Sequence, residues 1–378
     1  MAVPASPATT AVPDPPFVGY HRYRGTVGSQ PVTVELTIGP DPENSALVVC
    51  AGSYHYDRHL AGRLLLRGPR PFRPGQPLVL VETDAQRPTG RWQASQPIGN
   101  VLAGSWHSPA GQSLLFNLRE DYTDGQGRLM AVKYEVVSTA VEVPCRPERK
   151  EEETKADYRA RIATIDQGGY SQSFLHLLGP DTLRPSLQIL QCPVPAARRE
   201  QVRAAEKGED GCDFYTASLS VEYNDYGLLA WTEYSTQEFI TGARPQHNIQ
   251  AAVYDLRTGR TLRLKDVLRP HTDTLLQRLI TRSILRGDNP DIEPESSRKL
   301  PMHAVDLAPL STTFSLTDTG LEFAYYVDEF AQLHLIGGSP IVFSVPVPWA
   351  ELLPLLLPDS CVARMLRERG LWRNMRKQ

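Results

Sequence analysis

Residues 217–268 constrain the fold of this chain more than any other stretch, because they follow the pattern of an antiparallel β unit. Leu219, Val221 and Tyr223 alternate with polar neighbours, which is the period of a strand with one buried face. Residues 224–227 (Asn-Asp-Tyr-Gly) have the composition of a tight turn. Two further apolar runs and a second turn continue the pattern, at residues 228–239, 249–256 and 257–259.

The chain changes from strand to helix just after this unit. Residues 273–286 carry apolar side chains at helical spacing, and Gly287 follows where such a helix would end. The predicted apolar stripe consists of Leu275, Leu276, Leu279, Ile280 and Ile284. Later patterns predict a hairpin, a strand and a short helix, at residues 312–327, 341–347 and 347–352. We therefore expect an α+β domain with helices packed on an antiparallel sheet.

The first third of the chain predicts an all-β domain. Val32, Val34, Leu36 and Ile38 alternate with polar residues, and short apolar runs separated by Gly, Pro, Asp and Asn follow. This pattern of short strands and turns favours an antiparallel meander that forms a barrel or a sandwich. A small-Gly-x-Trp step occurs twice, 14 residues apart, and predicts neighbouring strands that present Trp92 and Trp106 from equivalent positions.

The length of 378 residues and changes in composition predict two domains. A charge run (Arg-Pro-Glu-Arg-Lys-Glu-Glu-Glu-Thr-Lys) predicts the joint between them, and a helix is expected at residues 195–207. The predicted parts are a disordered Pro-rich leader, an all-β domain, a charged linker or helix, an α+β domain and a basic, solvated tail, at residues 1–16, 17–145, 146–170, 171–357 and 358–378.

Charge and hydropathy exclude some functional classes. A formal net charge of −3 provides no general attraction to nucleic acid, and no apolar run is long enough to span a bilayer. The Pro/Ala/Thr-rich residues 1–16 resemble a spacer that follows a removed signal peptide or lipid anchor. We therefore expect a periplasmic or secreted protein, with a cytosolic one as the alternative.

The cysteines do not predict a metal site, because none of the five belongs to a C-x-x-C pair. Cys192 and Cys212 flank the helix expected at residues 195–207. They are either a disulfide or two buried thiols, and the spacing favours neither.

Residues from about 185 to 357 resemble the extracytoplasmic domain of lysozyme-sensing anti-sigma factors, which also occurs as the non-catalytic domain of some peptidoglycan deacetylases. The order of several short segments carries this resemblance, at residues 221–229, 241–243, 254–259, 262–266, 317–323 and 347–352. The resemblance implies a receptor, which in the anti-sigma factors binds lysozyme. The N-terminal part resembles a small all-β bacterial envelope module.

Candidate binding residues follow from this resemblance and from exposed aromatic side chains. Tyr325, Tyr326, Phe330 and His334 lie where the family has its recognition loop. Amphipathic aromatic residues on loops are effective contact residues. They could therefore bind a ligand, or Tyr325 could face the core of a sheet.

A second candidate lies in residues 54–59 (Tyr-His-Tyr-Asp-Arg-His). If this segment is a strand, either Tyr54 and Tyr56 stack on a sugar or protein, or they pack inward. In the second case His55, Asp57 and His59 share the outer face and are weak candidates for a metal site. The sequence predicts no cofactor.

No catalytic signature is present: the sequence has no G-x-S-x-G, H-E-x-x-H or phosphate-binding loop. We therefore expect a non-catalytic extracytoplasmic protein that binds an envelope protein such as lysozyme, or a cell-wall glycan. The alternatives are a hydrolytic enzyme that acts on a cell-wall polymer and a structural module of a larger envelope assembly. The oligomeric state is left open.

Overall fold

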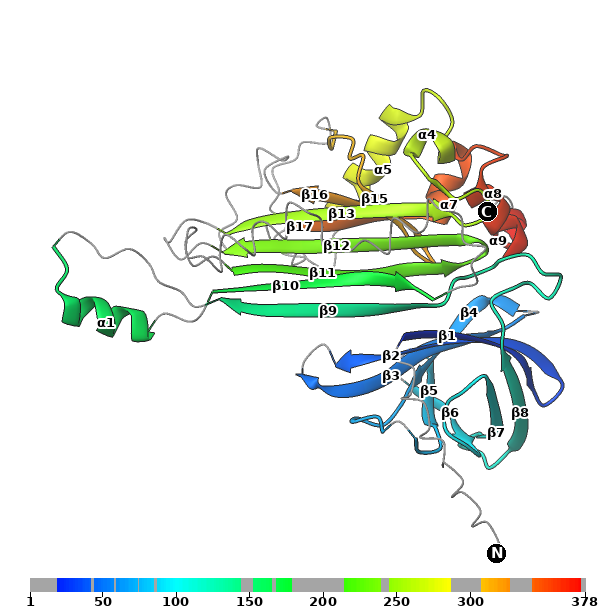
Figure 1. Cartoon of the computed structure of the whole chain (residues 1–378). Helices are drawn as coiled ribbons and strands as arrows, with labels where there is room; N and C mark the ends of the chain where they lie inside the picture. The colour runs from blue at the N-terminus through cyan, green and yellow to red at the C-terminus, as the bar shows by residue number, and fades with distance from the viewer. Residues whose placement is uncertain are drawn as a thin grey trace, which may run out of the picture. The chain divides into compact units, whose positions relative to one another are not determined.

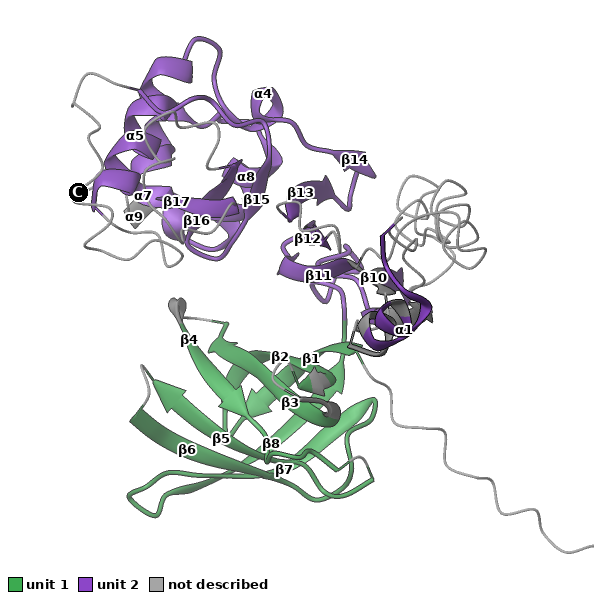
Figure 2. Cartoon of the chain, turned by 90° about the vertical axis from the view of Figure 1, so that its left-hand side faces the viewer, with its two compact units in different colours: residues 1–121 green, residues 122–378 purple. Residues whose placement is uncertain are grey.

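The computed structural model describes residues 19–41, 44–57, 59–73, 75–84, 87–143, 152–164, 168–178, 214–238, 245–286, 307–326 and 342–374. These residues form two compact units, 1–121 and 122–378, which Figure 2 shows in different colours. Strand dominates both units, and the predicted class, an N-terminal antiparallel meander followed by a sheet with helices, is confirmed.

Unit 1 is a closed, antiparallel barrel of eight strands in sequence order (Figure 1). The strands are β1 (Gly19–Val27), β2 (Gln30–Asp41), β3 (Asn44–Tyr56), β4 (His59–Arg67), β5 (Val79–Asp84), β6 (Arg87–Ala94), β7 (Val101–His107) and β8 (Ser113–Glu120). The barrel closes where β1 pairs with β8. The apolar residues of β2 that alternate in sequence all point into its core, because a strand places every second side chain on one face.

The main sheet of unit 2 has six strands in the order β14-β13-β12-β11-β10-β9 (Figure 1). They are β9 (Tyr134–Val143), β10 (Gly168–Leu177), β11 (Phe214–Asp225), β12 (Leu228–Glu238), β13 (Gln246–Asp255) and β14 (Arg260–Thr261). β10 and β11 run parallel, and the other neighbours are antiparallel. The predicted unit at 217–268 therefore contains the neighbouring strands β12, β13 and β14 and most of β11. Tyr226 and Gly227 both have positive φ, as a two-residue hairpin turn requires.

A three-stranded sheet consists of β15 (Phe314–Leu316), β16 (Gly320–Tyr326) and β17 (Val342–Pro348), and all three strands contact the main sheet. The helices in the described part of unit 2 are α1 (Lys155–Thr164), α4 (Leu264–Val267), α5 (Asp273–Arg286), α7 (Trp349–Leu352), the 3-10 turn η4 (Leu353–Leu355), α8 (Cys361–Glu368) and α9 (Leu371–Asn374). The two sheets and the helices other than α1 enclose one large apolar core.

The helix expected at residues 273–286 is present as α5, which packs on β17. Its buried stripe differs from the prediction at one position, because Leu275 is 48% exposed. Leu276, Ile280 and Ile284 face the core, and Leu279 packs against it while only partly buried. Helical spacing shows which face of a helix is buried, but it does not show how far around the helix the buried face extends.

The expected boundary between the two domains differs from the division of the chain into compact units. The compact units divide between Asp121 and Tyr122, whereas the sequence predicted the joint at residues 146–170. β9, which the prediction placed in the first domain, pairs along its whole length with β10 of unit 2. α1 occupies part of the predicted linker.

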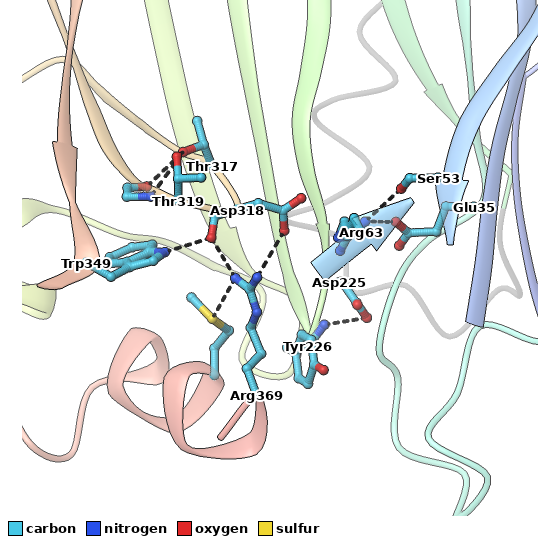
Figure 3. A network of polar contacts seen from close by, with 12 residues as sticks. Glu35, Ser53, Arg63, Asp225, Tyr226, Thr317, Asp318, Thr319, Trp349 and Arg369 are labelled. Atoms are coloured by element: carbon cyan, nitrogen blue, oxygen red, sulfur yellow. Dashed lines mark hydrogen bonds and ion pairs between the residues drawn. The ribbon is translucent and has the colours of Figure 1, made fainter. Parts of the chain in front are cut away.

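The segment expected as a solvated tail, residues 358–378, contributes side chains between residues 362 and 372 to the core. α8 buries Val362, Met365 and Leu366, and α9 buries Trp372. In the sequence, the basic residues that lie between these apolar residues made the segment resemble a polar terminus. Arg369 follows α8 and is only 8% exposed. Its guanidinium group donates a hydrogen bond to the backbone of the turn between β15 and β16 (Figure 3).

Some expectations concern residues outside the described ranges: the leader 1–16, the helix 195–207 and the pair Cys192 and Cys212. Cys50 and Cys361 are free thiols. No helix within the described ranges is both long enough and apolar enough to cross a membrane.

Candidate functional site

Tyr325, a predicted contact residue, lies in the core of unit 2 instead of on its surface. Its side chain is fully buried, stacks on Phe343 at 5.8 Å between ring centroids, and donates a hydrogen bond to the Pro309 carbonyl oxygen at 2.8 Å. Of the two alternatives left open for Tyr325, the structure has the one in which it faces the core of the sheet, because period-two alternation in β16 turns this residue inward. Phe330 and His334 lie outside the described residues.

Tyr326 is half-buried and fastens the end of β16 to β13. Its hydroxyl donates to Asn248 Oδ1 at 2.5 Å and accepts a hydrogen bond from the Ile249 backbone N at 3.2 Å. Tyr234 of β12 and His247 of β13 form a second hydrogen-bonded, partly exposed pair. Tyr326 thus has a structural role in the hydrogen bonding between the two sheets.

Tyr54 and Tyr56 do not form an exposed stacking surface. Tyr54 is 1% exposed, points into the barrel and packs edge-on against Trp92 at 5.0 Å. Tyr56 is half-buried and packs against the barrel core beside Tyr54. The alternative reading, with both rings turned inward, describes their placement.

The weak metal candidates beside them do not form a site in the described part of the chain. His55 is buried, and its Nε2 lies 4.0 Å from Asp57 Oδ1. The Asp57 carboxylate accepts a hydrogen bond from Thr33 and lies 3.7 Å from Arg24. The side chain of His59 lies outside the described residues, and no three ligating groups converge among those described.

A buried carboxylate organises the interior of the barrel. Glu82 Oε2 accepts hydrogen bonds from the Tyr54 hydroxyl at 2.8 Å and from the indole N–H groups of Trp92 at 3.0 Å and Trp106 at 2.7 Å. Thr89 donates to Oε1 at 2.8 Å. The interior of an eight-stranded barrel is narrow enough for side chains to fill it. Here four of these side chains donate hydrogen bonds to the buried carboxylate, which meets its need for partners. We interpret this cluster as the polar centre of the barrel core.

The repeated Gly-x-Trp step explains how this cluster forms. Trp92 and Trp106 are directly paired across β6 and β7, as predicted. A Cβ atom on Gly90 would lie 2.3 Å from the Trp106 Nε1, so only glycine leaves space for that indole to reach Glu82. Burial, with the nearby carboxylate contributing, raises the pKa of Tyr54 and keeps it a hydrogen-bond donor.

A candidate binding site lies in unit 2, where α4 leads into α5. This basic pocket has a volume of about 540 Å³ and is lined by residues between 262 and 276, together with Leu310 and Thr312. Leu268 and Leu276, which are buried, supply its apolar floor. The volume lies within the usual range for a small-molecule site.

Cationic side chains surround this pocket. Arg263, Lys265 and Arg269 line it, with Asp273 as the one acid, so the formal charge is three positive and one negative. Across the described residues, none of the three cations forms an ion pair. Arg269 Nε donates to the Leu356 carbonyl oxygen at 2.9 Å, which fixes this side chain against the protein. An excess of unpaired cations favours an anionic ligand.

The N-terminus of α5 adds to this preference. The first turn of the helix lines the pocket, and the positive end of the helix dipole favours negative charge. His271, with a φ of +61°, lies in the turn between the helices and also lines the pocket. The sequence pattern does not reveal this site, because its basic residues alternate with leucines in a stretch whose spacing indicates only secondary structure.

Comparisons with known proteins place these observations in context. No family model matches the chain, and no curated protein sequence matches it. A solved structure of a DUF3298 family member from Bacteroides fragilis is similar, with 13% identity and a TM-score of 0.43, over 64% of this chain and 98% of that one. A DUF3298 family protein from Pseudomonas aeruginosa has 15% identity and a TM-score of 0.39, over 60% of this chain and 95% of that one.

Proposed function

We propose that this chain is a non-catalytic binding protein of the bacterial envelope that holds a carboxylate-bearing cell-wall glycan in the basic pocket. The observation that carries the proposal is the convergence of Arg263, Lys265 and Arg269 on an apolar floor at the start of α5. Such a site matches a ligand with an anionic group and an apolar part. Peptidoglycan fragments carry both, in their peptide carboxylates and methyl groups.

The geometry favours a glycan fragment over a protein partner. The pocket is concave and has the volume of a small ligand, whereas protein partners usually require an extended surface with aromatic anchors. Tyr325 and Tyr54, two of the aromatic residues expected to make such contacts, are buried. A protein such as lysozyme is therefore the alternative outcome of the test.

Binding is better supported than hydrolysis. A serine or threonine hydroxyl contacts an imidazole in two pairs among the described residues: Ser105 Oγ with His107 Nε2 at 2.8 Å, and Thr236 Oγ1 with His247 Nδ1 at 3.2 Å. In neither pair does a described carboxylate orient the imidazole. Both hydroxyls lie on strands paired on each side, so the nearby backbone N–H groups are used in the sheets.

Titration calorimetry of the full chain with a soluble disaccharide–peptide fragment of peptidoglycan tests this proposal. We expect saturable binding that weakens as salt is added, because exposed charges are screened. The double substitution Arg263→Glu and Lys265→Glu should weaken binding at least about tenfold, or about 1.4 kcal/mol.

The matched control is Arg260→Glu with Arg278→Glu, which makes the same change in charge at exposed positions outside the pocket. This control should bind like the wild type. An equal loss of affinity in both double variants would show that binding depends only on the net charge of the protein, and this would contradict the proposed site. Binding of lysozyme, without binding of the fragment, would favour the protein partner instead.

A further inference from the structure

A second depression lies on the outer surface of the barrel in unit 1. This outer groove, about 710 Å³ in volume, crosses β6, β7, β8 and β1. Outward side chains that line it include Thr26, Gln93, Ser105, Leu115 and Asn117. None of its lining residues carries a formal charge, in contrast to the basic pocket.

The strand register explains the hollow. The lining side chains form two adjacent cross-strand rows, Gln93–Ser105–Leu115 and Ala103–Asn117–Thr26. Most of them are short, whereas Arg91 and Arg119, which are exposed at the next outward positions of β6 and β8, lie outside the groove. A patch of short side chains with longer neighbours makes a shallow groove on an otherwise convex wall.

The groove has free hydrogen-bonding capacity. Within the described ranges, the side chains of Thr26, Gln93 and Asn117 make no hydrogen bond. Two amides and a hydroxyl offer both donors and acceptors, as sugar hydroxyls require. Leu115 is 76% exposed beside them and offers an apolar contact for the C–H face of a sugar ring.

The same groove does not suit two other ligand classes. A charged ligand would lose hydration without gaining a counter-charge. A peptide cannot add as an extra strand, because β6, β7, β8 and β1 each pair on both sides in the closed barrel. A neutral ligand that is rich in hydroxyl groups therefore complements the outer groove best.

We propose that the outer groove binds an uncharged oligosaccharide. This deepens the proposed function, since it names neutral sugar as the ligand class of a second, separate site in unit 1, in addition to the acidic ligand of the basic pocket. The inference rests on the proposed function only in naming the cell wall as the source of that sugar. The groove and the pocket share no residue, so either site can fail without the other.

The test is titration calorimetry of the full chain with a neutral hexamer of N-acetylglucosamine and with cellohexaose. We expect saturable binding of at least one of them. Replacing Gln93→Ala and Asn117→Ala together should weaken it about tenfold, because each lost hydrogen bond contributes modestly. Ser105→Trp, which fills the groove at an outward position, should abolish it.

Leu115→Ala and Leu65→Ala provide a matched comparison, because both leucines are exposed on the barrel but only Leu115 lines the groove. Binding should weaken in the first variant and stay unchanged in the second. Substitution of Arg263 and Lys265 should leave binding of the neutral sugar unchanged. No saturable binding by the wild type, equal binding by the groove variants, or preferential binding of an uncharged peptide would overturn the proposal.

Discussion

Arg369 donates a hydrogen bond from Nη1 to the backbone carbonyl oxygen of Asp318, 2.9 Å away and 51 residues earlier in the chain. The indole N–H of Trp349 donates to the same oxygen at 3.1 Å (Figure 3). The end of α8, the start of α7 and the turn between β15 and β16 thus meet at one atom. This contact joins the C-terminal residues to the three-stranded sheet.

The first prediction is that Arg369→Ala destabilises unit 2. The substitution removes a largely buried charged donor and leaves the Asp318 carboxylate without its cation 3.5 Å away. We expect the free energy of unfolding to fall by about 2 kcal/mol. Arg278→Ala, at an exposed position of α5, should change it by less than about 0.5 kcal/mol. Chemical denaturation measures both, and equal stability of the two variants would contradict a structural role for the C-terminal helices.

The second prediction concerns glycine in the barrel. Gly90→Ala places a methyl group against the Trp106 indole and displaces it from Glu82, whereas a Cβ atom on Gly39 meets nothing within 4 Å. Gly90→Ala should therefore destabilise unit 1 by about 1–3 kcal/mol. Gly39→Ala should be close to neutral. Denaturation followed by tryptophan fluorescence distinguishes them, and a stable Gly90→Ala protein with unchanged fluorescence would rule out the proposed packing.

The third prediction is that the Cys50 thiol is unreactive in the folded protein. Burial raises its pKa to about 12, so the thiolate is scarce near neutral pH, and its side chain is 2% exposed. Iodoacetamide labelling followed by peptide mass spectrometry should modify Cys50 at pH 8 only after denaturant is added. Rapid labelling of Cys50 in the native protein would show that the barrel opens readily.

The fourth prediction is loss of barrel stability at alkaline pH. The Cys50 thiol ionises near its ordinary pKa of 9.0 when unfolded but near 12 when folded. The unfolded state therefore loses its proton first, and this contribution to stability, present below pH 9, is lost as the pH rises toward 12.

The slope should approach about 1.4 kcal/mol per pH unit for this thiol, with Tyr23 and Tyr54 adding to it because burial raises the pKa of each hydroxyl. Denaturation midpoints of the wild type and Cys50→Ala, measured at increasing pH, give the thiol contribution by difference. Parallel pH profiles for the two proteins would contradict it.

Local sequence patterns predicted the elements that depend on local periodicity. The strands β11, β12 and β13 and both ends of α5 follow from alternation, turn residues and Gly287. Closure of the barrel did not follow, because it depends on β1 pairing with β8, far apart in sequence. The same patterns allowed either a barrel or a sandwich.

Burial of ambivalent residues was harder to predict. Tyr54 and Tyr325 suit both a core and a binding surface, and period two alone does not say which face is inside. In α8, Val362, Met365 and Leu366 have helical spacing, but the interspersed arginines made the segment resemble a solvated terminus. The basic pocket also depends on segments around residues 262–276 and 310–312 meeting in space, which no linear motif records.

The continuous ring of strands in unit 1 separates two kinds of position. Inward side chains such as Trp92 and Glu82 depend on one another, so a change at one demands changes at several. Outward side chains such as Gln93 and Leu115 touch little else and can be exchanged one at a time. The outer surface of unit 1, including the groove proposed to bind a sugar, can therefore change by single substitutions while the strands of the barrel and its core stay the same.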